Sequence, residues 1–284
     1  IAAGNNNFRN GLTAPACIST AVAAGGVTDS DNPPADSVIF NLHSLVDLLA
    51  PAYGITSSVI GGYGGMSGTS MAAPHVAGAF ALCKSANPAL SVNQIETILE
   101  QTGVAVRDQR SGGVYTRPRL QLDAAVAACQ QVAVWSGAAN TAWNNPANWS
   151  GGALPGVAAF VNIPAAPAGG RFPTISGRAE MRSLLLEPGA RLSLANATLA
   201  LYGSLEALGA ATVTASNSTL LLSGSQLASL ALPAGQTLQH MQVGDGSEPF
   251  QLTLEGNVAL NGNLTVQPGA TLDLAGAALT VEGS

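Results

Sequence analysis

The apolar residues of this chain follow two different spacings. Up to about residue 130 they recur every three or four positions, which is the helical period, or form short continuous runs typical of buried strands. From Val132 onward they alternate with small or polar residues, as in a strand with one buried face. The pattern therefore predicts an α/β part followed by an all-β part.

A nearly all-apolar helix is predicted over Met71–Leu82, with Ser70 at its N-terminus. Gly68 and the pair Gly64–Gly65 allow the tight turn that precedes it. Because this helix has no polar face, we expect it to be buried. Its free N–H groups and dipole favour negative charge, which develops on a peptide oxygen under attack. Pro74 is expected in the first turn, where a missing N–H costs little.

The segment Gly68–Gly78 resembles the serine motif of the subtilisin-like serine proteases, the subtilases. This resemblance implies that Ser70 is the catalytic nucleophile. A second segment, Ala2-Ala3-Gly4-Asn5, resembles the oxyanion-hole strand end of that family. It implies that Asn5 donates to the oxyanion and that Ala2, Ala3 and Gly4 line the substrate pocket. The resemblance also implies part of a doubly wound parallel sheet and a cis Ala14–Pro15 bond.

Two members of the catalytic triad are absent from this sequence. Subtilases carry the triad in the order Asp, His, Ser, but no Asp-Thr-Gly and no His-Gly-Thr-His segment precedes Ser70. We therefore expect a fragment of a longer precursor that begins inside a strand at Ile1. His75 falls on another side of the helix from Ser70, and His43 and His240 have no carboxylate at a suggestive spacing. The fragment alone should have little peptidase activity.

Further helices are predicted after the serine motif. Ser91 and Gln94 form a capping-box pair before a helix that ends at Gly103. A last short helix is expected over Leu120–Cys129. These elements predict a catalytic half over residues 1–130, a Trp- and Gly-rich junction over 131–156 and a β-repeat domain over 157–284.

The composition limits the partners of the chain. Charged residues make up 9% of it and the net charge is −6, against about a quarter charged in average proteins, so nucleic-acid binding is not expected. No apolar run is long enough for a transmembrane helix. No cofactor or metal is expected, although Asp29 and Asp31 could touch a structural calcium ion if they do not simply form a solvated turn.

The three cysteines are compatible with an exported protein. We expect Cys83 to pair with Cys129, joining the serine helix to the last helix, and Cys17 to pair with a cysteine outside this chain. The alternative is that all three are free, buried thiols.

The segment Trp135–Gly156 holds all three tryptophans of the chain. It resembles the entry segment of bacterial surface and autotransporter-like β-repeat regions. The tryptophans are expected to cap a small β core, and the alternative is that they stack on sugars.

A nine-residue sequence recurs in the all-β part. Leu186–Leu194 echoes Val266–Leu274, with a looser copy at Leu232–Leu238. Stacked turns of a parallel β-solenoid would explain the recurrence, and an antiparallel β-sandwich is the alternative. This part holds no convergent set of His, Asp, Glu or Cys, so we assign it no chemistry.

These features together predict a secreted or surface-exposed bacterial serine endopeptidase that acts on polypeptides. The β-repeat region would serve in spacing, adhesion or secretion, with a cell-surface ligand as a possible partner. The alternative is a non-enzymatic surface protein that carries a decayed protease half.

Overall fold

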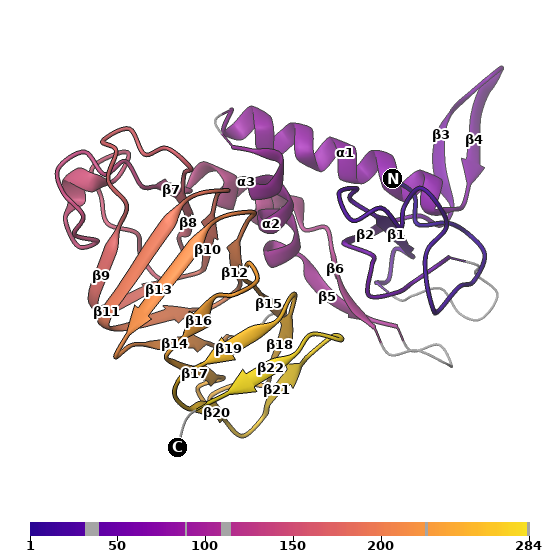
Figure 1. The fold of residues 1–284 in the computed structure, drawn as a ribbon. Helices are drawn as coiled ribbons and strands as arrows, with labels where there is room; N and C mark the ends of the chain where they lie inside the picture. Colours follow the sequence, from indigo (N-terminus) through magenta and orange to yellow (C-terminus); the bar gives the residue numbers. More distant parts are fainter. Residues whose placement is uncertain (32–39, 89, 109–114, 225–226, 283–284) are drawn as a thin grey trace. The chain divides into compact units, whose positions relative to one another are not determined.

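A computed structural model describes residues 1–31, 40–88, 90–108, 115–224 and 227–282 (Figure 1). The chain divides into two compact units, Ile1–Gln130 and Gln131–Ser284. Among the described residues, no helix is both long enough and apolar enough to cross a membrane.

The first unit contains a four-stranded sheet in the order β1-β2-β6-β5. Its strands are β1 (Ala24–Val27), β2 (Leu48–Pro51), β5 (Val104–Arg107) and β6 (Thr116–Arg119). The pairs β1–β2 and β2–β6 are parallel, whereas β5 is antiparallel to β6. The sheet is therefore mixed, and the expectation of a purely parallel sheet is wrong for β5. The link between β5 and β6 is too short for the crossover that parallel neighbours require.

A separate hairpin of β3 (Ile55–Val59) and β4 (Gly62–Met66) leads into helix α1 (Thr69–Ala86). The buried residues of α1 are Thr69, Ala72, Val76, Ala79 and Cys83, which lie on one side. On the other side Leu82 is 48% exposed. The expectation of burial all round is therefore wrong. Within the described residues, α1 packs against β1, β2 and the other helices of this unit. These neighbours cover one face of α1.

Helix α2 (Val92–Thr102) begins with the predicted capping box. Ser91 Oγ accepts from Gln94 N, and Gln94 Oε1 accepts from Ser91 N. Gly103 follows its last residue as predicted, but with φ −68°, so no left-handed conformation is needed there. A Cβ at this position would come within 2.7 Å of Pro118 Cβ. Close packing therefore explains this glycine.

Helix α3 (Leu122–Gln130) is joined to α1 by the predicted disulfide between Cys83 and Cys129. Both cysteines are fully buried, whereas Cys17 is a free, exposed thiol. The Ala14–Pro15 bond is cis, as the family resemblance implied.

We predict that replacing Cys83 by Ser lowers the free energy of unfolding of the first unit by about 2–4 kcal/mol, because the unfolded chain regains the entropy of a long loop. Urea denaturation followed by circular dichroism measures the change. Cys17→Ser is the control and should leave the stability unaltered. Alkylation without reductant should modify Cys17 alone, and modification of all three cysteines would contradict the disulfide.

The second unit consists of parallel strands in three sheets. The sheets run in the orders β21-β18-β15-β12-β10-β8-β7, β13-β11-β14-β17-β20 with β9 also beside β11, and β16-β19-β22. The strands are β7 (Ala133–Val134), β8 (Phe160–Ile163), β9 (Thr174–Met181), β10 (Ser183–Leu186), β11 (Arg191–Leu201), β12 (Leu205–Ala207), β13 (Thr212–Ser216), β14 (Thr219–Leu222), β15 (Leu227–Ala231), β16 (Thr237–Leu238), β17 (His240–Val243), β18 (Phe250–Leu254), β19 (Val258–Leu260), β20 (Leu264–Val266), β21 (Ala270–Asp273) and β22 (Leu279–Val281).

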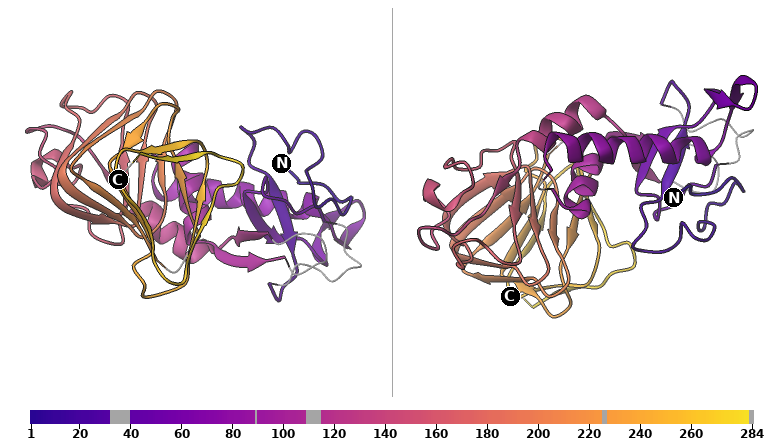
Figure 2. Two further views of the ribbon diagram at one scale, coloured as in Figure 1. Left: turned by 60° about the horizontal axis from the view of Figure 1, so that its bottom comes forward. Right: turned by 90° about the horizontal axis from the view of Figure 1, so that it is seen from above.

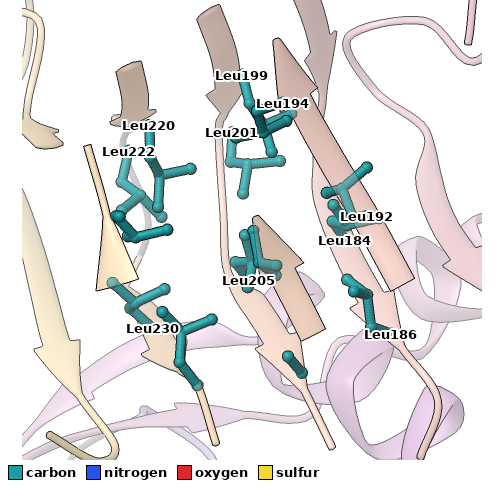
Figure 3. Packing of buried hydrophobic residues seen from close by; sticks show 14 of the residues in the cluster. Leu184, Leu186, Leu192, Leu194, Leu199, Leu201, Leu205, Leu220, Leu222 and Leu230 are labelled. Carbon is teal, nitrogen blue, oxygen red and sulfur yellow. The ribbon is translucent and has the colours of Figure 1, made fainter. Parts of the chain in front are cut away.

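Except for the pair β7–β8, paired strands of this unit are two or three strands apart along the chain. Leu184 pairs with Leu205, and Leu205 pairs with Leu230, all in parallel strands. Their side chains therefore form a column inside the unit (Figure 3). All strand pairs between these elements are parallel. The antiparallel sandwich, the alternative from the sequence, is wrong.

The recurring nine-residue sequence marks corners of this chain path, but not one equivalent corner. Pro188 lies between β10 and β11, where the chain passes from the seven-stranded to the six-stranded sheet. Pro268 lies between β20 and β21, where the chain passes in the opposite direction. The glycine after each proline has a left-handed φ, 88° at Gly189 and 84° at Gly269. The recurrence therefore encodes a turn conformation that fits more than one corner.

The tryptophan segment packs as one edge of the second unit and includes a short 3₁₀ helix, Pro146–Asn148. Trp135, Trp143 and Trp149 belong to its buried core. The ring of Trp149 meets those of the other two edge to face, at 4.6 and 5.1 Å between centroids. Since the three rings are buried, they offer no free face to a sugar, and the expectation that they cap a β core is confirmed.

Candidate active site

Ser70 is the second residue of α1 and is exposed. Gly68 precedes the helix with φ 157°, and its N–H donates to the carbonyl of Ala52 at 2.8 Å. The Ser70 N–H is one of the first-turn amides that a helix leaves without an internal partner. Pro74 is the sixth residue of the helix, beyond the expected first turn. It still leaves the Ser70 carbonyl without a helical N–H donor.

The side chain of Asn5 is hydrogen-bonded to the residue directly before Ser70. Its Oδ1 accepts from Thr69 N at 3.0 Å and from Thr69 Oγ1 at 3.2 Å. Both bonds use the Oδ1 atom of the Asn5 amide group. Its Nδ2 atom takes part in neither bond and can donate to another acceptor. A Cβ at Gly68 would lie 3.3 Å from Asn5 Nδ2. Glycine at position 68 therefore keeps the space beside this donor open.

Thr69 is a site residue that the sequence patterns did not single out. Its side chain is fully buried, and its Oγ1 accepts from Gly4 N at 3.1 Å while donating to Asn5 Oδ1. One hydroxyl thus connects the start of α1 to the loop that carries Asn5. The sequence shows only that Thr69 directly precedes Ser70, whereas its burial and its hydrogen bonds are known from the fold.

Asn41 is a second residue that was missed. It is fully buried, its Oδ1 accepts from Asn6 N and Phe8 N at 2.9 Å, and its Nδ2 donates to Ala3 O at 3.0 Å. Asn41 therefore holds the backbone on both sides of Asn5. Nothing in its neighbours along the sequence indicates this role.

The three predicted pocket residues differ in exposure. Ala3 is fully buried in a core cluster with Val27, Leu42 and Val46, so its side chain cannot line an open pocket. Ala2 and Gly4 are half-buried and keep some accessible surface. Gly4 has φ 103°, a conformation that favours glycine.

The histidines of the chain are engaged away from Ser70. His75 is exposed, and its Nδ1 contacts the carbonyl of Met71 at 2.8 Å. His43 Nδ1 accepts from Leu45 N, and burial lowers the pKa of His43, with a smaller contribution from the charge of Arg117. His240 Nδ1 accepts from Asn263 N in the second unit. Within the described residues, none of them is hydrogen-bonded to Ser70.

Among the described carboxylates, the group with metal-ligand spacing does not include Asp29 or Asp31. Asp31, one of the two residues considered for calcium, pairs with Arg119 at 2.6 Å, and Asn32 of the same turn lies outside the described residues. In the described part of the chain, Asp47, Glu96 and Glu100 bring ligand atoms within 4.8 Å of one another. Asp47 Oδ2 accepts from Ala23 N at 2.6 Å, and burial raises the pKa of Asp47.

Residues 1–150 match the subtilase family. Alkaline serine exoprotease A from Vibrio alginolyticus is 42% identical over 100 residues, which are 35% of this chain and 18% of that protein. Subtilisin BL from Lederbergia lenta is 36% identical over 107 residues, 37% of this chain and 39% of that protein. The chain thus spans between about a fifth and two fifths of these relatives.

Among solved structures, a cold-adapted subtilisin-like serine proteinase is 38% identical to this chain. The similarity covers 42% of each chain, with a TM-score of 0.38.

Proposed function

Because this chain belongs to the subtilase family, we propose that residues 1–130 form the half of a serine endopeptidase that carries the nucleophile and the oxyanion donor. The observation that carries this proposal is the hydrogen bonding of the Asn5 side chain to Thr69, directly before Ser70 at the start of α1. A carboxamide that donates to the oxyanion and a helix-terminal serine that attacks the carbonyl carbon are two groups that acyl transfer needs.

In this mechanism the Ser70 hydroxyl oxygen attacks the carbonyl carbon of a peptide bond, and its proton passes to a histidine base. The carbonyl oxygen becomes negative and accepts from Asn5 Nδ2 and the Ser70 N–H. The tetrahedral intermediate then expels the amine, which takes the proton from the histidine. Water releases the acyl group by the same steps in reverse. The backbone of Ala2 and Gly4 would flank the substrate.

The histidine and its orienting aspartate would come from outside residues 1–284. Two observations support this: the sequence contains neither triad segment, and each histidine described above is engaged elsewhere. Residues 1–284 alone should therefore turn over a peptide substrate very slowly. Turnover by this chain that Ser70→Ala abolishes would contradict the proposal.

The second unit is proposed to be a parallel β-solenoid of the kind found in bacterial surface and autotransporter-like proteins, with its boundary at Gln130. Its parallel strand pairs, one circuit apart, support this architecture. The low charge content and the disulfide support a secreted or surface location. A structural calcium ion and a cell-surface ligand of the second unit remain proposals.

Labelling with a fluorophosphonate probe tests the proposed activity. In the longer polypeptide that includes the triad Asp and His, the probe should modify Ser70, as located by mass spectrometry of the digested protein. Absence of labelling there would instead favour the alternative, a decayed protease half that serves as a scaffold. Labelling of a different serine would overturn the assignment of the nucleophile.

Thr69 provides a further prediction for the same polypeptide. Thr69→Val removes the hydroxyl that holds Asn5 Oδ1 and Gly4 N, with little change in volume. We expect kcat to fall about 5- to 30-fold with KM nearly unchanged, corresponding to roughly 1–2 kcal/mol for the lost hydrogen bonds. Steady-state kinetics on a peptide substrate measures the change. The control is Thr56→Val on the exposed strand β3, and equal rates for both variants would contradict the role of Thr69.

A further inference from the structure

The loop that carries the oxyanion donor is fixed at its far end by a distant part of the sequence. We call residues 5–9 the donor loop. Thr69 holds its first residue, Asn5, and Asn41 holds its middle. Its last residue, Arg9, contacts residues at the ends of β5 and β6. Figure 2 shows the indigo N-terminal segment close to these magenta strands, as the contacts require.

Arg9 is bound through both its backbone and its side chain. Its carbonyl accepts from Tyr115 Oη at 3.1 Å, and its Nη1 lies 3.7 Å from Asp108 Oδ2. Its Nε and Nη2 donate to Asn7 Oδ1 at 3.3 and 3.0 Å. Asn7 has φ 57°, a left-handed conformation that asparagine adopts more readily than most residues. One guanidinium therefore joins the turn of the donor loop to the residue that follows β5.

Asp108 and Tyr115 form a firm support for Arg9. Asp108 follows β5, Tyr115 precedes β6, and Asp108 N donates to Tyr115 O at 2.8 Å. The Asp108 side chain is fully buried, whereas that of Arg9 is 16% exposed. Taking the guanidinium away from a buried carboxylate is costly, so the pair resists separation. The Tyr115 ring packs against the core cluster that contains Ala3.

We propose that Asp108 and Tyr115 are positioning residues for the oxyanion donor. Through Arg9 they fix the donor loop and therefore the direction in which Asn5 Nδ2 points. An oxyanion donor must lie about 2.7–3.1 Å from the developing charge, and a misplacement of about 1 Å costs up to about 100-fold in rate. Fixing the loop at both ends and in the middle limits such misplacement. The inference rests on the proposed function of Asn5 and Ser70.

Kinetics of the longer polypeptide with the complete triad test the inference through the donor itself. Tyr115→Phe removes one hydroxyl and should lower kcat about 3- to 10-fold with KM nearly unaltered, the effect of one hydrogen bond. Asp108→Asn should lower kcat about 10- to 100-fold. In the Asn5→Ala background both substitutions should change kcat less than about twofold, because the donor that they position is gone. Tyr202→Phe is the matched control, since it removes a 3.1 Å hydroxyl bond to Glu180 in the second unit, and it should leave kcat unaltered.

Amide hydrogen exchange in the 284-residue chain adds a measurement that needs no catalysis. Three amides at the donor loop donate to side chains, those of Asn6, Phe8 and Thr69. Tyr115→Phe and Asp108→Asn should each speed their exchange about fivefold or more. Exchange in α2 should stay unaltered, which separates loosening of the donor loop from unfolding of the first unit.

Equal losses of kcat in the parent and in the Asn5→Ala background would overturn the inference, since they indicate a purely structural role. Unaltered exchange at the three amides would overturn it as well. Should Asp108→Asn fail to fold, Tyr115→Phe decides alone. A parent polypeptide that the fluorophosphonate probe labels at Ser70 but that shows equal losses overturns only the positioning role. A parent that is not labelled overturns the proposed function and, with it, this inference.

Discussion

Replacing Ser70 by Ala is expected to lower kcat about 10⁶-fold in the polypeptide that includes the complete triad. This magnitude is the one known for subtilisin, a member of the same family, and is taken over rather than derived. The physical reason is that the alanine methyl group cannot form the acyl-enzyme. Residual turnover should remain above the rate in water, because Asn5 still donates to the oxyanion. Single-turnover hydrolysis of a peptide substrate measures the loss.

Comparing the rates of the Asn5→Ala and Ser70→Ala variants distinguishes the oxyanion donor from the nucleophile. Asn5→Ala should lower kcat about 10²- to 10³-fold, roughly 2.7–4 kcal/mol, again the value for the corresponding donor of subtilisin. Ser70→Ala should leave the unfolding free energy nearly unaltered, since Ser70 is exposed and alanine favours a helix. If Ser70→Ala retained activity within tenfold of the parent, the nucleophile would have to be another residue.

Replacing Trp135 by Ala is expected to lower the unfolding free energy of the second unit by about 3–5 kcal/mol. The Trp135 ring is fully buried, stacks beside Trp143 at 6.2 Å and meets Trp149 edge to face. Its Nε1 donates to the carbonyl of Arg171 at 2.6 Å. The substitution therefore leaves a cavity and an unpaired carbonyl at the same place.

Urea denaturation followed by far-UV circular dichroism measures this change, because the signal does not depend on the number of tryptophans. Leu154→Ala is the matched control, since Leu154 is 47% exposed in the same segment and its loss should cost little. A cost for Trp135→Ala below about 1 kcal/mol would contradict a role of the cluster in closing the core.

Features encoded by residues close together in sequence were predictable. The capping box of α2 depends on Ser91 and Gln94, three positions apart. The turns at Gly189 and Gly269 require a left-handed residue after a proline, and the recurring sequence supplies it at both places. The likeness of Gly68–Gly78 and Ala2–Asn5 to subtilase motifs predicted that these two segments meet at one site, and the fold places Asn5 against Thr69.

Other features depended on partners far away in the sequence. The all-apolar composition of α1 indicated burial on every side, whereas packing covers one face. The recurring sequence marks corners, but the chain passes from the seven-stranded to the six-stranded sheet at Pro188 and in the opposite direction at Pro268.

The sequence alone determined the two classes of secondary structure, the helix caps, the turn residues and the family motif around Ser70, because each depends on near neighbours and on the spacing of apolar residues. Only the tertiary structure decided that Thr69 and Asn41 hold the Asn5 loop and that β5 runs antiparallel to β6. These features arise where segments distant along the chain meet, and the hydrogen-bond partners and burial that define them exist only after the chain has folded.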